Sequence, residues 1–291
     1  MIGRRGLLIG SLCTGAALFG FRAAAFDFDG QLHGALADLE QKHGGRLGVA
    51  ILDTATMRRI ARRGDERFPL CSTFKFLAAA FVLARVDRKE ESLARRIIYA
   101  SDVLVAHSPI TEKHVAGDGL PVGEICKAAV SVGDNTAGNL LLDSFGGPAG
   151  LTAYVRSLGD NFTRIDRRET QLNEAAPGDP RDTTTPLAML EILHKTVLGT
   201  ALSAPSRQQL MAWLVASTTG GNRLRAGIPT GWRVGDKTGS GENNTTNDVA
   251  VIWPPRRAAL IVTVYYTEAR ASAVERDSVL SEVGRLVAAL N

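Results

Sequence analysis

The order of apolar and polar residues divides the chain into strand-rich ends and a helix-rich middle. Residues 31–42 have the apolar spacing of an amphipathic helix, which a glycine pair ends. Residues 47–53 and 57–62 have the composition of two strands around a short polar turn, which predicts a hairpin. Three later segments are rich in β-branched and aromatic residues: 232–238, 248–253 and 259–266. A last amphipathic helix is predicted over residues 272–290.

Between these ends the pattern is mainly helical. The predicted helices are 72–86, 121–132, 136–142, 147–158, 186–196 and 205–216. Pro148, Pro186 and Pro205 stand at first-turn positions, where the missing N–H of proline does no harm. Residues 164–185 are polar with little periodicity, which predicts a compact surface loop.

Strands from both ends of the chain can pair in one sheet, with the helical middle inserted between them. We therefore expect an α/β (α+β) fold, in which terminal helices flank a five-stranded antiparallel sheet. Residues 26–68 and 217–291 would form the α/β subdomain, and residues 69–216 the inserted all-helical subdomain. A length of 291 residues suits one large domain or two subdomains.

Residues 1–25 are predicted to be an export signal. Arg4 and Arg5 precede an apolar run over residues 7–21, and three alanines at 23–25 offer a small-residue cleavage site. The arginine pair resembles a twin-arginine signal, with a general secretory signal as the alternative. The apolar run is short and rich in glycine for a transmembrane helix. We expect a mature chain that is periplasmic or secreted and has no stable membrane association.

Composition excludes several other functions. The net charge of +4 owes much to the arginines of the predicted signal, and the rest of the chain is close to neutral. No basic stripe is interleaved with aromatic residues, so nucleic acid is not an expected partner. The scattered cysteines and histidines have no metal-ligand spacing, and neither a metal nor another cofactor is expected. Nothing in the sequence demands more than a monomer.

A serine and a lysine three residues apart open the most apolar helical run, within Cys71-Ser72-Thr73-Phe74-Lys75. Residues three apart share a helix face, so the Ser72 hydroxyl and the Lys75 amine can meet. A serine becomes nucleophilic when a neighbouring base takes its proton, and a desolvated lysine can be that base. Backbone N–H groups near the helix start can help to stabilise an oxyanion. The alternative is that Ser72 only caps the helix.

Two further motifs carry groups that could bind a ligand. Gly235-Asp236-Lys237-Thr238-Gly239-Ser240 lies on a predicted strand, where an amine and two hydroxyls can hold a carboxylate against the strand edge. The alternative is a strand end with turn residues. Val132-Gly133-Asp134-Asn135 lies between two predicted helices, where Asp134 or Asn135 can also serve as a helix cap.

The predicted loop contains a carboxylate and an amide at helical spacing. Glu169 and Asn173 are four residues apart, so one helical turn would place both on one face. Together they can hold a water molecule and activate it. The alternative is a solvated turn without chemistry.

In this order and spacing the four motifs resemble the class A β-lactamases, whose signature is Ser-x-x-Lys, Ser-Asp-Asn and Lys-Thr-Gly. The resemblance covers nearly all of the mature chain, including Ser108-Pro109-Ile110-Thr111-Glu112-Lys113-His114 and Asp182-Thr183-Thr184-Thr185-Pro186. It implies the β-lactamase/transpeptidase-like fold. It also implies hydrolysis of β-lactam antibiotics, such as penicillins and cephalosporins, and hence a link to antibiotic resistance.

The resemblance gives each motif residue a role. Ser72 would be the nucleophile that forms the acyl-enzyme, with Lys75 as a base or proton relay. Glu169 would activate the deacylating water, which Asn173 helps to hold, and either Lys75 or Glu169 would be the base in acylation. Backbone N–H groups of Ser72 and Ser240 would form the oxyanion hole. The remaining implied residues are substrate contacts at His107, Asn135, Thr219, Lys237, Thr238 and Ser240, and a loop bridge between Arg167 and Asp182.

The chain departs from the family at the Ser-Asp-Asn motif, which reads Gly133-Asp134-Asn135. The missing serine normally passes a proton to the lactam nitrogen as the C–N bond breaks. Ser131 would lie roughly 200° further round a helix and should not replace it. A water beside Gly133 could carry the proton, so we expect acylation that is slower or narrower in substrate range. A nearly inactive enzyme is the alternative.

Two arginines compete to bind the substrate carboxylate. The strand after Lys237 lacks the arginine that some members place there, and Arg223 is favoured over Arg276 as the replacement. His107 takes the position of an aromatic gate and is expected to stack on substrate rather than titrate. Cys71 and Cys126 each lack the partner that family members supply, so two free thiols are expected.

Two other functions share part of this pattern. A penicillin-binding carboxypeptidase-like enzyme or transpeptidase also has Ser-x-x-Lys and Lys-Thr-Gly, but it lacks a deacylating carboxylate such as Glu169. A β-lactam-binding protein with little turnover is the second alternative, because the relay serine is missing.

Overall fold

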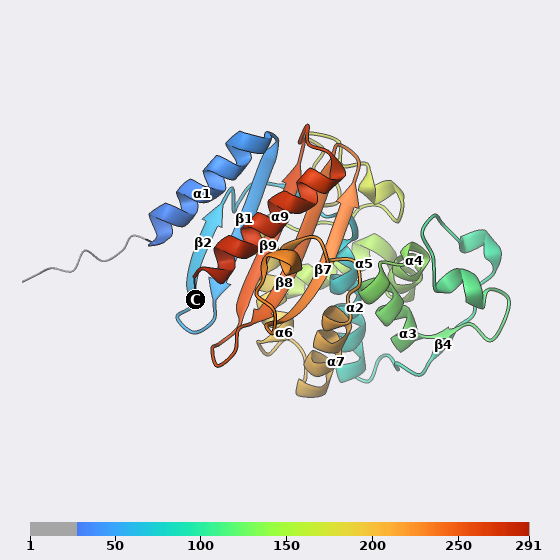
Figure 1. The fold of residues 1–291 in the computed structure, drawn as a ribbon. Coiled ribbons are helices and arrows are strands. Elements are labelled where there is room, and N and C mark those ends of the chain that lie inside the picture. Colours follow the sequence, from blue (N-terminus) through green and yellow to red (C-terminus); the bar gives the residue numbers. More distant parts are fainter. Residues whose placement is uncertain (1–27, 291) are drawn as a thin grey trace, which may run out of the picture.

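An antiparallel sheet of five strands organises the fold in the computed structural model, which describes residues 28–290 (Figure 1). The predicted export signal over residues 1–25 lies outside the described residues. The spatial order of the strands is β2-β1-β9-β8-β7. Their bounds are β1 Arg46–Asp53, β2 Arg58–Arg62, β7 Arg233–Gly241, β8 Thr245–Trp253 and β9 Leu260–Thr267. The two N-terminal strands thus pair with the three C-terminal ones through β1 and β9.

The terminal helices α1 (Phe28–His43) and α9 (Ala273–Ala288) cover one face of the sheet, as Figure 1 shows. Successive strand residues point to opposite faces of the sheet, so each strand contributes side chains to two apolar cores. Val49 and Ile51 pack in the core beneath α1 and α9, whereas Leu52 packs in the core on the other face. This alternation is why β1 is apolar along its whole length.

The helical region covers the other face and is built around α2 (Phe74–Asp87). Most residues of α2 are buried, which is expected of a helix that is apolar all round. The remaining helices are α3 Val122–Lys127, α4 Asn135–Ser144, α5 Gly147–Ser157, α6 Pro186–Val197, α7 Ala204–Val215 and the short α8 Leu224–Gly227. Among the described residues no helix combines the length and apolar character needed to cross a bilayer.

Short elements complete the helical region and correct the prediction that the insert is all-helical. Two small strand pairs interrupt it, β3 (Phe68–Pro69) with β6 (Thr183–Thr184) and β4 (Arg96–Ile97) with β5 (Leu120–Pro121). The insert is therefore helical but not purely so. Turns of 3₁₀ type lie at η1 Cys71–Thr73, η2 Ser101–Val103, η3 Thr111–His114 and η5 Gln171–Asn173, and a π-type turn at η4 Ala128–Val132.

Two predicted helices begin or end differently in the structure. The helix predicted over 72–86 starts with the 3₁₀ turn η1, and the one over 121–132 is α3 followed by the π-type turn. In both places local tertiary contacts override the helical pattern. The five-stranded antiparallel sheet and its flanking helices are confirmed. The exact subdomain boundaries stay a prediction, because one apolar core contains residues from α2 and from the sheet.

We expect Gly284→Ala in α9 to lower the free energy of unfolding by about 1–3 kcal/mol, because the added methyl group overpacks a close contact. A Cβ at Gly284 would lie 2.4 Å from the Leu224 carbonyl oxygen. Gly34→Ala in α1 is the matched control, since its Cβ would meet no atom within 4 Å. There the helix propensity of alanine should stabilise by about 1 kcal/mol. Urea unfolding measures both, and two stabilising effects would contradict the close packing of α8 on α9.

Candidate active site

A cavity of about 260 Å³ lies where the helical region meets strand β7. It brings together eleven residues that are far apart in the sequence. They are Ser72, His107, Gly133, Asn135, Asn173, Thr219, Arg223, Lys237, Thr238, Gly239 and Ser240. Lys75 and Glu169 are buried next to Ser72. The predicted site residues therefore converge, apart from Arg167 and Asp182, which lie in the loop that carries Glu169.

Ser72 is hydrogen-bonded to the two groups that could take its proton. Lys75 Nζ lies 2.9 Å from Ser72 Oγ, and Ser72 Oγ lies 3.0 Å from Glu169 Oε1. Lys75 Nζ and Glu169 Oε1 are 2.8 Å apart and complete a triangle. The prediction that Ser72 and Lys75 meet is confirmed. The capping alternative is wrong, because Thr73 is the N-cap residue of α2.

The Lys75 amine is fully buried and has polar partners on several sides. It donates to the Gly133 carbonyl oxygen at 2.9 Å and to Asn135 Oδ1 at 2.5 Å. Burial lowers the pKa of Lys75, and the neighbouring Glu169 carboxylate opposes that shift. The lysine is thus held at one position, with its pKa moved towards that of a usable base.

Glu169 is fixed through both its side chain and its backbone. Asn173 Nδ2 donates to Glu169 Oε2 at 2.5 Å, so the predicted pair meets, although Glu169 precedes the short 3₁₀ turn η5 and is not on a shared helical turn. Asn173 Oδ1 is buried without a protein donor, so it is free to accept a hydrogen from a water molecule. The Glu169 backbone is clamped by Asn139, whose side chain bonds both its N–H and its C=O at 2.9 Å. The Glu169–Thr170 peptide bond is cis.

Sequence reasoning missed the role of Asn139. It lies four residues after Asn135 in α4, so the two amides share one helix face. This four-residue spacing was the signal in the sequence that pointed to Asn139. Asn135 contacts Lys75, and Asn139 contacts the loop that carries Glu169. One face of α4 thus positions two parts of the site.

The loop carrying Glu169 is closed by an ion pair between Arg167 and Asp182. Arg167 Nε lies 2.6 Å from Asp182 Oδ2, and Asp182 Oδ1 accepts from the Asp166 and Arg167 backbone N–H groups at 2.8 and 2.9 Å. The Asp182 carbonyl also accepts from the Leu70 N–H at 2.8 Å, just before the turn that bears Ser72. The predicted bridge therefore exists as a contact, and it couples the loop to the nucleophile.

Strand β7 presents a second buried amine. Lys237 is 1% exposed, and its Nζ donates to the Thr238 carbonyl oxygen at 2.7 Å. Burial, together with the positive charge of Lys75, lowers the pKa of Lys237 to about 7. Thr238 Oγ1 and Thr219 Oγ1 are 2.6 Å apart, so the two hydroxyls form a pair on the cavity wall.

Arg223, not Arg276, lies at this wall. Its guanidinium donates to Ser240 Oγ at 2.7 Å and is held from behind by Asp277 at 2.8 Å. Arg276 instead donates to Thr246 Oγ1 and the Asn244 side chain, and it is not among the cavity residues.

Gly133 leaves open space in the cavity wall. Its backbone has φ +77°, and a Cβ there would have no atom closer than His107 Nε2 at 3.8 Å. Ser131 donates to the Trp213 carbonyl oxygen at 2.8 Å and is committed elsewhere, as its position predicted. The next residue, Asp134, caps α4 and accepts from the Thr111 N–H at 2.9 Å. The segment is therefore rigid although the serine is absent.

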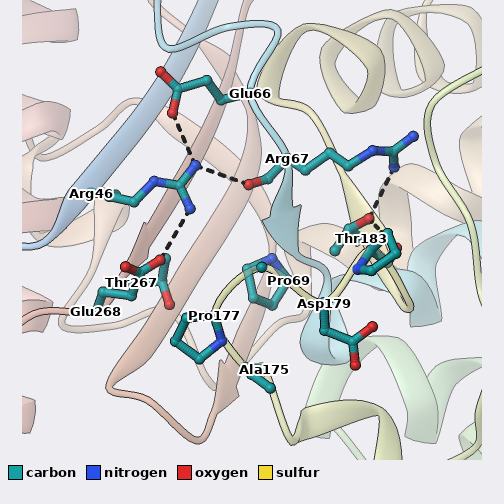
Figure 2. Close-up of a pocket in the computed structure, with 13 residues that line it drawn as sticks. Arg46, Glu66, Arg67, Pro69, Ala175, Pro177, Asp179, Thr183, Thr267 and Glu268 are labelled. Carbon is teal, nitrogen blue, oxygen red and sulfur yellow. Dashed lines mark hydrogen bonds and ion pairs between the residues drawn. The ribbon is translucent and has the colours of Figure 1, made fainter.

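A second cavity, of about 270 Å³, lies behind the Glu169 loop (Figure 2). Arg46 stands between Glu66 at 2.9 Å and Glu268 at 3.1 Å, while Arg67 reaches towards Thr183. Its arginines thus have partners already, and its lining includes no serine, cysteine or histidine.

Cys71 and Cys126 are free buried thiols, as predicted, and burial raises the pKa of both. Within residues 28–290 no group of His, Cys, Asp and Glu side chains is arranged to hold a metal ion.

A serine hydroxyl in contact with a buried lysine and a buried carboxylate is an arrangement that serine-nucleophile enzymes use. The family model of the β-lactamase enzyme family matches residues 31–290. The chain is 48% identical to β-lactamase OXY-2 of Klebsiella oxytoca over 256 residues, which is 88% of each chain. It is 49% identical to β-lactamase CTX-M-8 of Citrobacter amalonaticus over 252 residues, covering 87% of this chain and 86% of that protein.

Solved structures agree with these relatives. The ancestral (GNCA) class A β-lactamase is 64% identical, with a TM-score of 0.89 over 90% of this chain and 100% of that chain. The GNCA4 last common ancestor of Gram-negative bacteria is 62% identical, with a TM-score of 0.88 over 89% of this chain and 98% of that chain. The chain belongs to the class A β-lactamases, hydrolases that act on β-lactams.

We expect Lys237→Met to stabilise the fold below pH 7 and to stabilise it less as the pH rises towards 10.5. The pKa of Lys237 is about 7 in the folded protein, whereas the ordinary value for a lysine in the unfolded chain is 10.5. Between these values the unfolded chain holds a proton that the folded protein lacks, so native stability rises with pH and the advantage of methionine shrinks. Denaturant unfolding at several pH values measures this. Lys127→Met, at an exposed site, controls for the loss of one charge, and an advantage independent of pH would contradict the prediction.

Proposed function

We propose that Ser72 opens the ring of penicillins and cephalosporins, forms an acyl-enzyme, and is released by a water that Glu169 activates. The observation that carries this proposal is the triangle of Ser72 Oγ, Lys75 Nζ and Glu169 Oε1, with sides of 2.9, 3.0 and 2.8 Å. A hydroxyl that donates to a buried carboxylate and accepts from a buried amine has the arrangement that nucleophilic catalysis requires.

In acylation, Ser72 Oγ attacks the lactam carbonyl carbon while its proton passes to Lys75 or Glu169. Lys75 Nζ and Glu169 Oε1 both lie within hydrogen-bond distance of Ser72 Oγ, so either group can be the base in acylation. The oxyanion that develops is held by the backbone N–H groups of Ser72 and Ser240. Each such donor is worth about 3–4 kcal/mol in comparable hydrolases.

The substrate carboxylate is placed against strand β7, where Arg223, Lys237, Thr238 and Ser240 line the cavity. Support comes from the two cationic side chains on that wall and from the paired hydroxyls of Thr219 and Thr238. Asn135 also lines the cavity. Its Oδ1 accepts from Lys75 and its Nδ2 donates one hydrogen to the Ala106 carbonyl oxygen at 2.8 Å, so the second Nδ2 hydrogen would bond the amide side chain of the substrate. His107 forms the rim and stacks on the substrate.

In deacylation, Glu169 takes a proton from water while Asn173 Oδ1 accepts its second hydrogen. Support comes from the buried acceptor on Asn173 and from the clamp that Asn139 places on Glu169. The Arg167–Asp182 bridge keeps the loop, and with it the carboxylate, at a fixed distance from Ser72.

Gly133 offers no hydroxyl to protonate the leaving nitrogen, in contrast to the serine of the Ser-Asp-Asn motif that the chain resembles. We expect turnover that is limited in acylation. The alternatives are a penicillin-binding carboxypeptidase-like enzyme and a β-lactam-binding protein with little turnover. Glu169, buried 3.0 Å from Ser72, favours turnover over both. The proposal also includes export by residues 1–25, action as a monomer in the periplasm or outside the cell, and no stable membrane association.

A stopped-flow trace with a chromogenic cephalosporin separates these functions. We expect steady turnover from the native protein, because Glu169 can activate water. A single stoichiometric burst without turnover would instead identify a binding protein or a carboxypeptidase-like enzyme.

Glu169→Gln should turn steady turnover into a burst, because glutamine cannot take the proton of water. Deacylation should slow by about 100-fold or more. Mass spectrometry should then find the acyl group on Ser72. Unchanged turnover in Glu169→Gln would remove Glu169 from its role.

Gly133→Ser should raise kcat/KM for the same cephalosporin, because it restores a hydroxyl beside the leaving nitrogen. Gly133→Ala is the matched control, since it imposes the same backbone strain at φ +77° without a hydroxyl. That strain costs roughly 1–2 kcal/mol of stability in both variants. If serine and alanine give the same kcat/KM, proton delivery does not limit acylation.

A further inference from the structure

The space beside Gly133 is bordered by two nitrogen-bearing side chains. A Cβ at Gly133 would lie 3.8 Å from His107 Nε2 and 4.0 Å from Lys237 Nζ, with Thr219 Cγ2 at 3.9 Å. A hydroxyl on that Cβ would therefore be close to an imidazole and an ammonium. The position of the missing serine and the position of the aromatic gate, two places where this chain departs from its family, are thus in direct proximity.

His107 is held in place by the segment that carries Gly133. The Asn135 N–H donates to the His107 carbonyl oxygen at 2.9 Å, and His107 Nε2 lies 3.3 Å from the Val132 carbonyl oxygen. A carbonyl only accepts, so Nε2 is the donor in that contact. The His107 backbone has φ +61°, a left-handed conformation that is uncommon for residues with a side chain.

We propose that His107 is the general acid of acylation and gives its Nε2 proton to the lactam nitrogen, an inference that rests on the proposed function. Ser72 Oγ bonds to the carbonyl carbon while its own proton passes to Lys75 or Glu169. As the C–N bond breaks, its electron pair moves to the nitrogen, which takes the proton from the imidazolium. The imidazole is left neutral. Its solvent-exposed ring regains a proton from water, and the base returns the Ser72 proton during deacylation.

Lys237 is the competing donor on the other side of the space. Both nitrogens have a carbonyl acceptor, but Lys237 Nζ lies 2.7 Å from the Thr238 oxygen whereas His107 Nε2 lies 3.3 Å from the Val132 oxygen, so the histidine contact is the weaker one and is more easily exchanged for the lactam nitrogen. Lys237 is also only 1% exposed. His107 is exposed at the cavity rim and can exchange protons with solvent after each turnover. These features assign the proton to His107 and leave Lys237 to bind the substrate carboxylate.

The test is a double-mutant cycle on kcat/KM for a chromogenic cephalosporin, a quantity that contains no step after acylation. His107→Phe keeps a flat ring for stacking but carries no transferable proton. In the native background it should lower kcat/KM by about 100-fold, a usual contribution of general acid catalysis. Beside Gly133→Ser, whose hydroxyl offers a second route for the proton, the same change should cost only a few-fold.

Gly133→Ala supplies the matched control, because it lacks a hydroxyl and should leave the full cost of His107→Phe in place. Thermal unfolding of each variant checks that the fold is kept. Equal losses in all three backgrounds would overturn the proposal and leave His107 a stacking residue only. No loss in the native background would overturn it in favour of Lys237 or a water. In both cases the native protein still turns over the cephalosporin, whereas a native protein without turnover refutes the proposed function itself.

Discussion

The ion pair between Lys75 and Glu169 is the interaction on which the rest of the structure depends. Their side chains are fully buried and 2.8 Å apart. A single charge at this depth, without its partner, would cost several kcal/mol, so the start of α2 and the loop that bears Glu169 must dock together. The Asn139 clamp and the Arg167–Asp182 bridge make that docking independent of any ligand. Separating the two side chains would leave each charge buried without its partner, which has a higher free energy, so the site is preorganised.

Close backbone approaches then set the width of the cavity. A Cβ at Gly138 in α4 would lie 2.9 Å from Lys75 Cε, so α4 can reach the lysine only with glycine there. On the sheet side, a Cβ at Gly239 would lie 3.0 Å from the Leu70 carbonyl oxygen. Strand β7 therefore lies directly against the turn that carries Ser72. Two positions without side chains thus hold the helical and strand walls at a fixed separation.

Much of this arrangement could be predicted, because the chemistry follows from spacing. Ser72 and Lys75 meet through helical geometry. Glu169 and Asn173 also meet, but through a turn with a cis peptide bond followed by a short 3₁₀ segment and not through a helical face. The five strands followed from composition and turn residues. The less regular parts could not be predicted, because their conformation depends on tertiary contacts. The 3₁₀ turn that carries Ser72 and the π-type turn before Gly133 depend on what packs against them, and periodicity has no signal for either. Asn139 was missed because its partner is a backbone peptide, and its four-residue spacing from Asn135 indicates only a shared helix face and not what that face contacts.

Strand β7 is an outermost strand of the sheet, with β8 on one side only. Strands in such positions usually carry features that prevent pairing with other chains, because their free N–H and C=O groups are a template for aggregation. This chain needs part of that edge open to meet a substrate, so the shielding falls to the turn before α2 and to α7, which pack against it. Mutations that loosen the helical region would then carry two penalties. They would weaken catalysis, and they would also uncover a surface prone to self-association, so solubility and activity are linked through one strand.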